Sequence, residues 1–213
     1  MKVKCITGGQ LDTNCYLVVN DDETHAVLID PGFYDSMLES IIVKYKDIID
    51  AVLLTHMHFD HIMGLEYIKS VICAPIYIHK LDFSDMTDPD KNCYSSFYGA
   101  NMDFSGFKAN RFFTDNSKLS FGDLVVSVFH TPGHTKGGVC YLINDCLFTG
   151  DTLFKESVGN PNFYGGDARI LLKSVNAISN FTEDYCIFPG HGEESTLLHE
   201  KRYNPYMRDN QWI

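Results

Sequence analysis

The residues best suited to chemistry lie together at positions 55–61, which read Thr-His-Met-His-Phe-Asp-His. Three histidines and one aspartate fall within six residues, directly after the apolar run 51–54. Imidazole nitrogens and carboxylate oxygens are good ligands for Zn²⁺, Fe and Mn. Placing three imidazoles side by side costs solvation and brings no packing benefit. The run therefore predicts metal binding by His56, His58, Asp60 and His61.

The spacing of this run divides its ligands into two groups. Residues i and i+2 of an extended segment point to the same side, so we expect His56 and His58 to project together from a strand end. Apolar residues recur at helical spacing over 62–68, which predicts a helix that begins nearby. That helix would turn Asp60 and His61 toward a second cluster.

The remaining ligands are predicted from three later loops. His134, Asp151 and His191 each lie in a glycine-containing loop that follows an apolar strand run. Ligands of open α/β sheets bind at such strand ends. Seven ligands from four strand ends would suit a site for two metal ions. Asp151 is the natural bridge between the ions, because a carboxylate has two oxygens.

The elements that must position these side chains are short apolar strands that alternate with amphipathic helices. Strands are predicted at 15–19, 25–29, 51–54, 76–78, 124–129, 139–143 and 185–188. Helices are predicted over 37–45 and 170–178, where apolar residues follow helical spacing. This alternation places the chain in the α/β class, with strands that are buried on both faces.

Two features describe the organisation of the chain. Residues 81–118 are rich in Asp, Asn, Ser, Phe and Tyr and lack periodicity, so we expect a functional loop or lid there. No linker divides the rest, which predicts a single domain over 1–213. The two halves also share a faint echo of strand, turn, strand and acid, which ends at Asp30 and again at Asp151. The echo is either a coincidence or the trace of a duplicated sandwich.

Composition and charge exclude several classes of protein. The 213 residues carry a formal net charge of −11, with an isoelectric point near 5.1, which argues against nucleic-acid binding. No apolar run approaches the roughly 20 residues that a membrane crossing needs, and the basic start lacks the apolar stretch of a signal peptide. The seven cysteines form no C-x-x-C pair and are expected to be free, mostly buried thiols. These features predict a cytoplasmic protein with no membrane partner.

Four motifs together resemble the metallo-β-lactamase-fold hydrolase superfamily. They are T-H-x-H-x-D-H-x-x-G at 55–64, T-P-G-H-T-x-G at 131–137, T-G-D-T-L-F at 149–154 and P-G-H-G at 189–192. N-C-Y-L-V at 14–18 and L-I-D-P-G at 28–32 look like the leading motif of that superfamily. The branch that the chain most resembles is the short glyoxalase II-like hydrolases. The resemblance implies a four-layer αββα sandwich, in which each half supplies one sheet and its flanking helices.

The resemblance also implies a role for each candidate residue. The two sets of ligands that it implies are His56, His58 and His134 for one metal ion, and Asp60, His61 and His191 for the other. Asp151 would bridge the two ions, and Asp30 would orient a ligand from outside the coordination shell. The expected cofactors are two divalent ions, zinc before iron or manganese.

The chemistry that follows from such a site is hydrolysis of an ester or thioester carbonyl. Two metal ions about 3.5–4 Å apart lower the pKa of a water toward ~7 and so provide hydroxide at neutral pH. One ion would polarise the carbonyl oxygen, and the other would receive the leaving thiolate or alkoxide. The catalytic carboxylates would be Asp151 and Asp60. Asp60 would orient the water or take its proton. Metal ligation alone accounts equally well for an aspartate at this position.

The expected partner is a small-molecule substrate. Residues 162–168 (N-F-Y-G-G-D-A) resemble the glyoxalase II segment that contacts glutathione, which implies a substrate contact for Tyr164. Asn162 stands where a Lys or Arg usually precedes the aromatic pair, and the chain ends at Ile213, with little room for the helical extension of glyoxalase II. Both departures leave the thiol part of the substrate open.

Three alternatives remain beside this interpretation. The same motifs occur in persulfide dioxygenases, which use a single Fe(II), and in lactonases or other ester hydrolases. A non-catalytic metal-binding protein would also keep the ligands. Metal content and activity on a thioester panel distinguish these alternatives. The sequence does not specify an oligomeric state.

Overall fold

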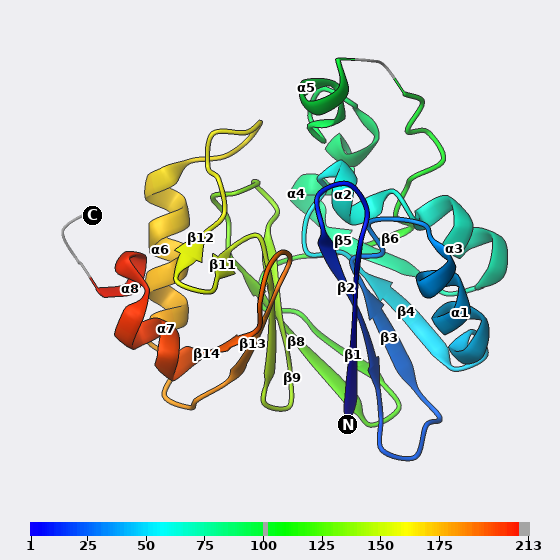
Figure 1. The fold of residues 1–213 in the computed structure, drawn as a ribbon, viewed down its shortest axis with the longest axis horizontal. Helices are drawn as coiled ribbons and strands as arrows, with labels where there is room; N and C mark the ends of the chain where they lie inside the picture. The colour runs from blue at the N-terminus through cyan, green and yellow to red at the C-terminus, as the bar shows by residue number, and fades with distance from the viewer. Residues whose placement is uncertain (100–101, 209–213) are drawn as a thin grey trace.

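Two six-stranded sheets lie face to face, and helices cover the outer side of each sheet (Figure 1). The computed structural model describes residues 1–99 and 102–208. The first sheet has the order β1 (Lys2–Gly8), β2 (Thr13–Val19), β3 (Ala26–Ile29), β4 (Ile49–Leu53), β5 (Ile76–His79), β6 (Arg111–Phe113). The second has the order β7 (Lys118–Phe121), β8 (Leu124–His130), β9 (Val139–Ile143), β10 (Cys146–Gly150), β13 (Cys186–Pro189), β14 (Ser195–Thr196).

The helices belong to two separate outer layers. The first half carries α1 (Ser36–Tyr45), α2 (Phe59–Ile62), α3 (Leu65–Val71), α4 (Lys80–Phe83), the 3₁₀ turn η1 (Asp85–Thr87) and α5 (Tyr94–Tyr98). The second half carries α6 (Ala168–Ser179), α7 (Leu197–Tyr203) and α8 (Pro205–Arg208), beside a small hairpin of β11 (Leu153–Phe154) and β12 (Ser157–Val158). The predicted α/β class and the four-layer αββα sandwich are confirmed. Among the described residues, no helix has the length and apolar character that crossing a membrane requires.

Alternation of side chains along the strands builds three apolar cores. On β2, Cys15 and Leu17 pack toward the helices of the first half, whereas Tyr16 and Val18 pack between the sheets. A third core lies beneath α6, where Leu171 and its neighbours meet the second sheet. Burying each large aliphatic side chain contributes about 1.5–3 kcal/mol. The central strands β2, β3 and β10 are therefore buried on both faces, as their apolar composition predicts, whereas β1, β6, β7 and β8 are partly exposed.

The faint echo between the two halves corresponds to a repeated topology. In the first sheet, β3 pairs antiparallel with β2 and, across α1, parallel with β4. In the second sheet, β10 pairs antiparallel with β9 and, across α6, parallel with β13. A left-handed turn ends each hairpin, at Asp30 with φ 48° and at Gly150 with φ 48°. Asp30 and Asp151 thus lie at the ends of topologically related strands, which is the arrangement expected of a duplicated sandwich.

The expectation of one long loop over 81–118 needs correction. This segment holds η1 and α5, and its residues 111–113 form β6, which pairs parallel with β5 at the edge of the first sheet. These elements have three to five residues each, too few to show a period in the sequence. The rings of Tyr94 and Tyr98 on α5 lie 5.7 and 5.5 Å from the ring of Phe59 on α2. The segment therefore packs over the helix that follows the first ligands.

Hydrogen bonds join the two sheets at the end where the candidate ligands lie. The Tyr16 hydroxyl donates to the Pro189 carbonyl at 2.6 Å, and the Tyr141 hydroxyl donates to the Leu54 carbonyl. The Val139 amide donates to the Thr55 carbonyl at 3.0 Å. Each bond connects one sheet to a loop or strand end of the other. The relative position of the sheets is thus fixed beside the site.

Candidate metal centre

Three buried histidines from two halves of the chain form the first ligand group. His56 and His58 follow β4, and His134 lies in the loop between β8 and β9. The three side chains are buried, and their ring centroids lie 4.6 to 4.9 Å apart. His134 Nε2 and His58 Nδ1 are 2.8 Å apart. Three ring nitrogens can thus reach one cation between them.

The second group combines the start of α2 with the loop after β13. His58 caps α2, so Asp60 and His61 lie in the first turn of this helix, as the sequence predicts. The Asp60 Oδ2 atom lies 3.2 Å from His191 Nε2 and 3.5 Å from His61 Nε2. These three side chains form a second set whose ligand atoms converge.

Asp151 lies between the two groups. Its Oδ1 atom is 3.4 Å from His61 Nε2, and its Oδ2 atom is 3.3 Å from His134 Nε2 and 3.7 Å from His191 Nε2. One carboxylate therefore faces a histidine of the first group and both histidines of the second. This is the position that a bridging ligand requires. The structure brings all seven predicted ligands together.

Hydrogen bonds outside the site orient the histidine rings. His61 Nδ1 donates to Asp30 Oδ2 at 2.9 Å, which places Asp30 outside the cluster of candidate ligand atoms. His134 Nδ1 donates to the Asn160 carbonyl at 2.8 Å, and His191 Nδ1 donates to the Leu11 carbonyl at 3.0 Å. Because Nδ1 carries the proton, the Nε2 lone pair of each ring faces the centre. Metal-binding histidines characteristically have such outer partners.

Unpartnered buried atoms show that these residues fit metal ions. His56 Nε2, His61 Nε2 and Asp151 Oδ1 are buried and have no hydrogen-bond partner among the described residues. Leaving buried polar atoms unpaired is costly, and bound cations would satisfy all three. His58 Nε2 is also unpartnered, and the edge of its ring contacts that of Phe163 at a centroid distance of 5.6 Å. The set of nitrogen and oxygen donors, with no thiolate, suits zinc, iron or manganese.

Burial and mutual charge determine the protonation of the ligands. Burial lowers the pKa of His56 and of His134, and it lowers the pKa of His58 to about 3. Burial opposes a charge on His61 as well, but Asp60, Asp30 and Asp151 overcome this effect and raise its pKa. The first group is therefore a set of neutral imidazoles with free lone pairs, as metal ligation requires.

The carboxylates of the centre stay ionised although they are buried. Burial raises the pKa of Asp151, but the neighbouring His61 and His134 outweigh it and hold the pKa well below its ordinary value. Burial also raises the pKa of Asp60, but the nearby His61 outweighs this effect, and the pKa of Asp60 is lowered. The ionised pair supplies the negative charge that divalent ions need.

Two glycines permit the close approach of the ligand loops. A Cβ atom at Gly190 would lie 2.3 Å from Asp151 Oδ1 and 2.8 Å from His61 Cε1. A Cβ atom at Gly32 would lie 1.6 Å from the Asp60 carbonyl oxygen. Both contacts are far shorter than van der Waals separations. The P-G-H-G and D-P-G motifs therefore need glycine for space.

Two residues that position the site, Asp82 and Asn14, were not predicted from the sequence. The buried Asp82 carboxylate accepts hydrogen bonds from the Gly137 amide at 2.7 Å, the Thr135 hydroxyl at 2.7 Å and the Met57 amide at 3.2 Å. It ties the loop of His56 and His58 to the loop of His134. Asn14 Nδ2 donates to the Pro189 and Gly192 carbonyls at 3.1 and 2.9 Å. Asn14 opens the leading motif, which was the available signal, whereas nothing in the sequence around Asp82 marks it.

The predicted substrate contact at Tyr164 lies at the rim of the site. Its side chain is 39% exposed, and its ring lies 4.8 Å from Lys136 Nζ and 5.6 Å from Lys91 Nζ. The neighbouring Phe163, rather than Tyr164, lines the cavity that contains His58, with a volume of about 120 Å³. The contact of Tyr164 with substrate stays a prediction.

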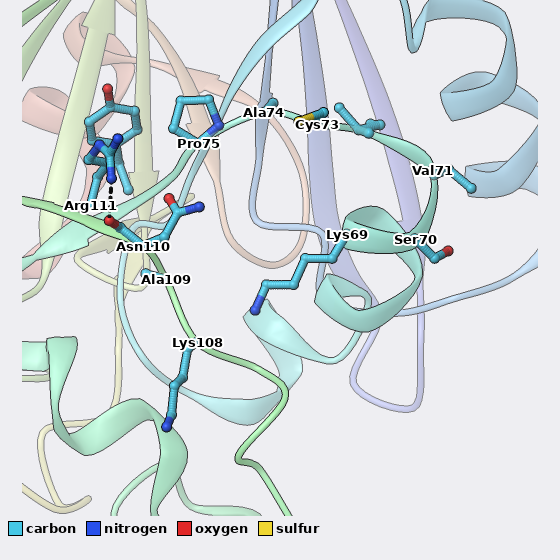
Figure 2. Close-up of a pocket in the computed structure, with 12 residues that line it drawn as sticks. Lys69, Ser70, Val71, Cys73, Ala74, Pro75, Lys108, Ala109, Asn110 and Arg111 are labelled. Carbon is cyan, nitrogen blue, oxygen red and sulfur yellow. Dashed lines mark hydrogen bonds between the residues drawn. The ribbon is translucent and has the colours of Figure 1, made fainter.

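A larger cavity lies elsewhere and contains none of the candidate ligands. Figure 2 shows this cavity of about 930 Å³, between the end of α3 and the chain that enters β6. Its three cations, Lys69, Lys108 and Arg111, extend in different directions and do not converge on one point (Figure 2). Lys69 Nζ donates to the Gly106 carbonyl at 2.7 Å. The catalytic candidates belong to the smaller cavity.

Comparison with known proteins identifies the class to which this fold and site belong. The sequence profile of the metallo-beta-lactamase superfamily matches residues 8–191. The chain belongs to this superfamily.

Individual relatives match nearly the whole length of the chain. The BLEG-1 B3 metallo-beta-lactamase superposes with a TM-score of 0.90 at 34% identity, over 98% of this chain and all of that one. TTHA1623, solved in a di-iron-bound form, superposes with a TM-score of 0.81 at 30% identity, over 96% of this chain and all of that one. The Bacillus subtilis protein named "Probable metallo-hydrolase YqgX" is 28% identical over 97% of this chain and 98% of its own length.

Proposed function

We propose that the chain is a metal-dependent hydrolase that cleaves an ester or thioester, in the manner of glyoxalase II. The observation that carries this proposal is the position of Asp151, within 3.3 to 3.7 Å of histidines from both ligand groups. A single carboxylate that serves two ligand groups is the arrangement that a two-metal site needs. The name of the Bacillus subtilis relative supports the same class of reaction.

The proposed cofactors are two divalent ions. The first would be held by His56, His58 and His134, the second by Asp60, His61 and His191, and Asp151 would bind both. Such ions lower the pKa of water and polarise a carbonyl oxygen, which is the chemistry that ester hydrolysis needs. We propose zinc, with iron, as in the di-iron form of TTHA1623, or manganese as the other outcomes of metal analysis.

The chain's own groups bind and orient the reactants. Asp60 Oδ2 accepts the Thr13 hydroxyl at 3.3 Å, which fixes the carboxylate that would orient a water or accept its proton. Phe97 and Phe163, with ring centroids 5.9 Å apart, form an apolar wall of the cavity. This wall would shield one side of the reacting carbonyl from bulk water. Tyr164, beside Lys136, would contact the polar part of a small-molecule substrate.

The proposed setting is the cytoplasm. The seven cysteines are all unpaired, and four of them are buried. Free thiols persist in a reducing compartment. Fractionation of the native host cells tests this location.

One experiment tests the function and its alternatives together. The purified protein is analysed for bound metal and then assayed against a panel of thioesters, esters and lactones, before and after removal of metal by a chelator. We expect about two metal ions per chain and hydrolysis that disappears on chelation and returns with metal. A single iron with oxygen consumption on a persulfide would favour the dioxygenase alternative, and metal without any turnover would favour the non-catalytic one.

A further inference from the structure

An apolar cavity lies directly beside the cavity that holds the metal ligands. It has a volume of about 330 Å³, and both cavities are lined by Leu11, Phe59 and Asp60. The buried Phe59 therefore lies at the boundary between the two spaces. A substrate whose reacting bond lies at the ligands can extend past Phe59 into the larger space.

The wall of this cavity is predominantly aromatic. Its aromatic and aliphatic side chains are Leu11, Phe33, Tyr34, Phe59, Met63, Tyr94 and Tyr98, and the polar Gln10 and Thr13 also line it. Among the described residues that line it, Asp60 is the one charged group, and Asp60 belongs to the candidate metal centre. An anion that entered the cavity would find no cation as a partner, and burying an unpaired charge is costly. The lining therefore disfavours an anionic group, and its aromatic side chains favour apolar contact.

Hydrogen bonding and ring packing hold this wall in place. The Tyr98 hydroxyl donates to Gln10 Oε1 at 2.6 Å, which links α5 to the turn between β1 and β2. The Tyr98 ring lies 4.7 Å from the Tyr94 ring and 5.5 Å from the Phe59 ring. In Figure 1, α5, α2 and this turn gather at the same edge of the sheets. The cavity is thus largely pre-formed, as binding sites for small molecules usually are.

We propose that this cavity binds an uncharged apolar or aromatic group attached to the bond that the metal centre cleaves. The inference rests on the proposed hydrolysis and adds a class of substrate to it. The group enters either on the acyl side or on the leaving-group side of the ester or thioester. Transfer of apolar surface from water would then contribute to catalytic efficiency in proportion to its area.

Two series of thioesters test the proposal with the metal-loaded protein. The first extends the acyl group from acetyl to octanoyl on one thiol, and the second extends the thiol on a constant acetyl group. We expect kcat/KM to rise about fourfold per methylene in one series, over the first several methylenes. The series that shows the rise identifies the side that enters the cavity. If the acyl series shows the rise, a succinyl thioester, with its extra carboxylate, should react far more slowly than butyryl thioester.

A pair of matched variants tests the location of the cavity. Tyr98→Glu places a charge on the wall and should lower kcat/KM for the longest substrate at least tenfold more than for the shortest. Tyr206→Glu makes the same replacement at a tyrosine of similar exposure, 41% against 39%, on α8 outside the cavity. Tyr206→Glu should retain the full dependence on chain length. If Tyr98→Glu does not fold, Met63→Gln provides the same comparison.

A binding measurement separates failure of this inference from failure of the proposed function. Calorimetry measures the binding of acetic, butyric, hexanoic and octanoic acids and of the corresponding thiols. This measurement does not require that the protein hydrolyse any thioester. Affinity that increases with chain length and falls in Tyr98→Glu supports the cavity even if no thioester is hydrolysed. Equal affinities along both ligand series, together with equal kcat/KM values where hydrolysis occurs, would overturn the proposal.

Discussion

Asp30 and Thr55 bind each other at the ends of the parallel strands β3 and β4. Asp30 Oδ1 accepts the Thr55 amide at 2.7 Å, and Asp30 Oδ2 accepts the Thr55 hydroxyl at 2.6 Å. The same Oδ2 atom accepts the ring N–H of His61 at 2.9 Å. One buried carboxylate thus connects the start of the ligand run with the fourth ligand in it.

The substitution Asp30→Asn should weaken metal binding. The new side chain would keep the size of the aspartate but would lose the charge that holds the Nδ1 proton of His61. Loss of an outer partner of this kind typically costs about 10- to 100-fold in metal affinity. A competition titration with a chromophoric chelator measures the change. Asp35→Asn, at the N-cap of α1, is the matched control and should leave metal affinity unchanged.

Replacing His58 with alanine should remove one metal ion and the activity. His58 is 4% exposed and lies against both His134 and Phe163, so removing its ring takes one of the three nitrogens from the first ligand group. Turnover should fall by more than the roughly 100-fold typical of an outer-shell loss. Metal content and hydrolysis are measured on the same sample, with His25→Ala at a partly exposed position as control. Activity that survives in His58→Ala would contradict the assignment.

Replacing Gly190 with alanine should reduce metal binding through space alone. The new Cβ atom would lie 2.3 Å from Asp151 Oδ1, so either this carboxylate or the loop after β13 must move. The variant should keep its far-ultraviolet circular dichroism spectrum, because the strand β13 itself ends before this residue. Loss of metal with retention of the spectrum is the expected result. A normal metal content would show that the loop yields without disturbing the ligands.

The buried Asp82 should make stability depend on pH. Burial raises the pKa of Asp82 to about 6, above its ordinary value of 3.8, so the folded state holds this proton more tightly than the unfolded state does. The contribution of Asp82 to stability is therefore full below about pH 4 and is lost as the pH rises through about 6. The difference in unfolding free energy between wild type and Asp82→Asn should fall by about 2–3 kcal/mol over that window.

Urea unfolding of the metal-free protein at pH 4, 5 and 7.5 measures this dependence. Asp47→Asn, at an exposed position, serves as the control and should show no comparable change with pH. If the Asp82→Asn difference is the same at all three pH values, the environment of Asp82 does not shift its proton equilibrium as described.

The candidate ligands could be located from the sequence because each lies in a short local motif. His56, His58, Asp60 and His61 share one run, and the strand that precedes them is apolar throughout. The similar ends of the two hairpins, at Asp30 and Asp151, were also visible as a repeated pattern. Local spacing was sufficient for these residues, and the α/β class followed from the alternation of strands and helices.

The rest of the site depends on contacts between distant parts of the chain. Asn14 reaches the Pro189 carbonyl across 175 positions, and Asp82 reaches Gly137 across 55. Neither partner lies within a period or motif that includes the other. The aromatic cavity likewise forms only when Phe33, Phe59 and Tyr98 come together from three segments. The helix and strand content of residues 81–118 was not predicted for the same reason. Elements of three to five residues gain their order from packing rather than from a pattern in the sequence.

The hydrogen bonds that join the two sheets also determine the geometry of the candidate metal centre. Four of the candidate ligands come from the half that carries β4, and three come from the half that carries β9, β10 and β13. The centre therefore lies between the two halves. The distances from a bound metal ion to its ligands would depend on how the halves are aligned. A small displacement of one sheet relative to the other would change the ligand field of the bound ion. Spectroscopy of a substituted cobalt ion could then serve as a gauge of strain between the halves.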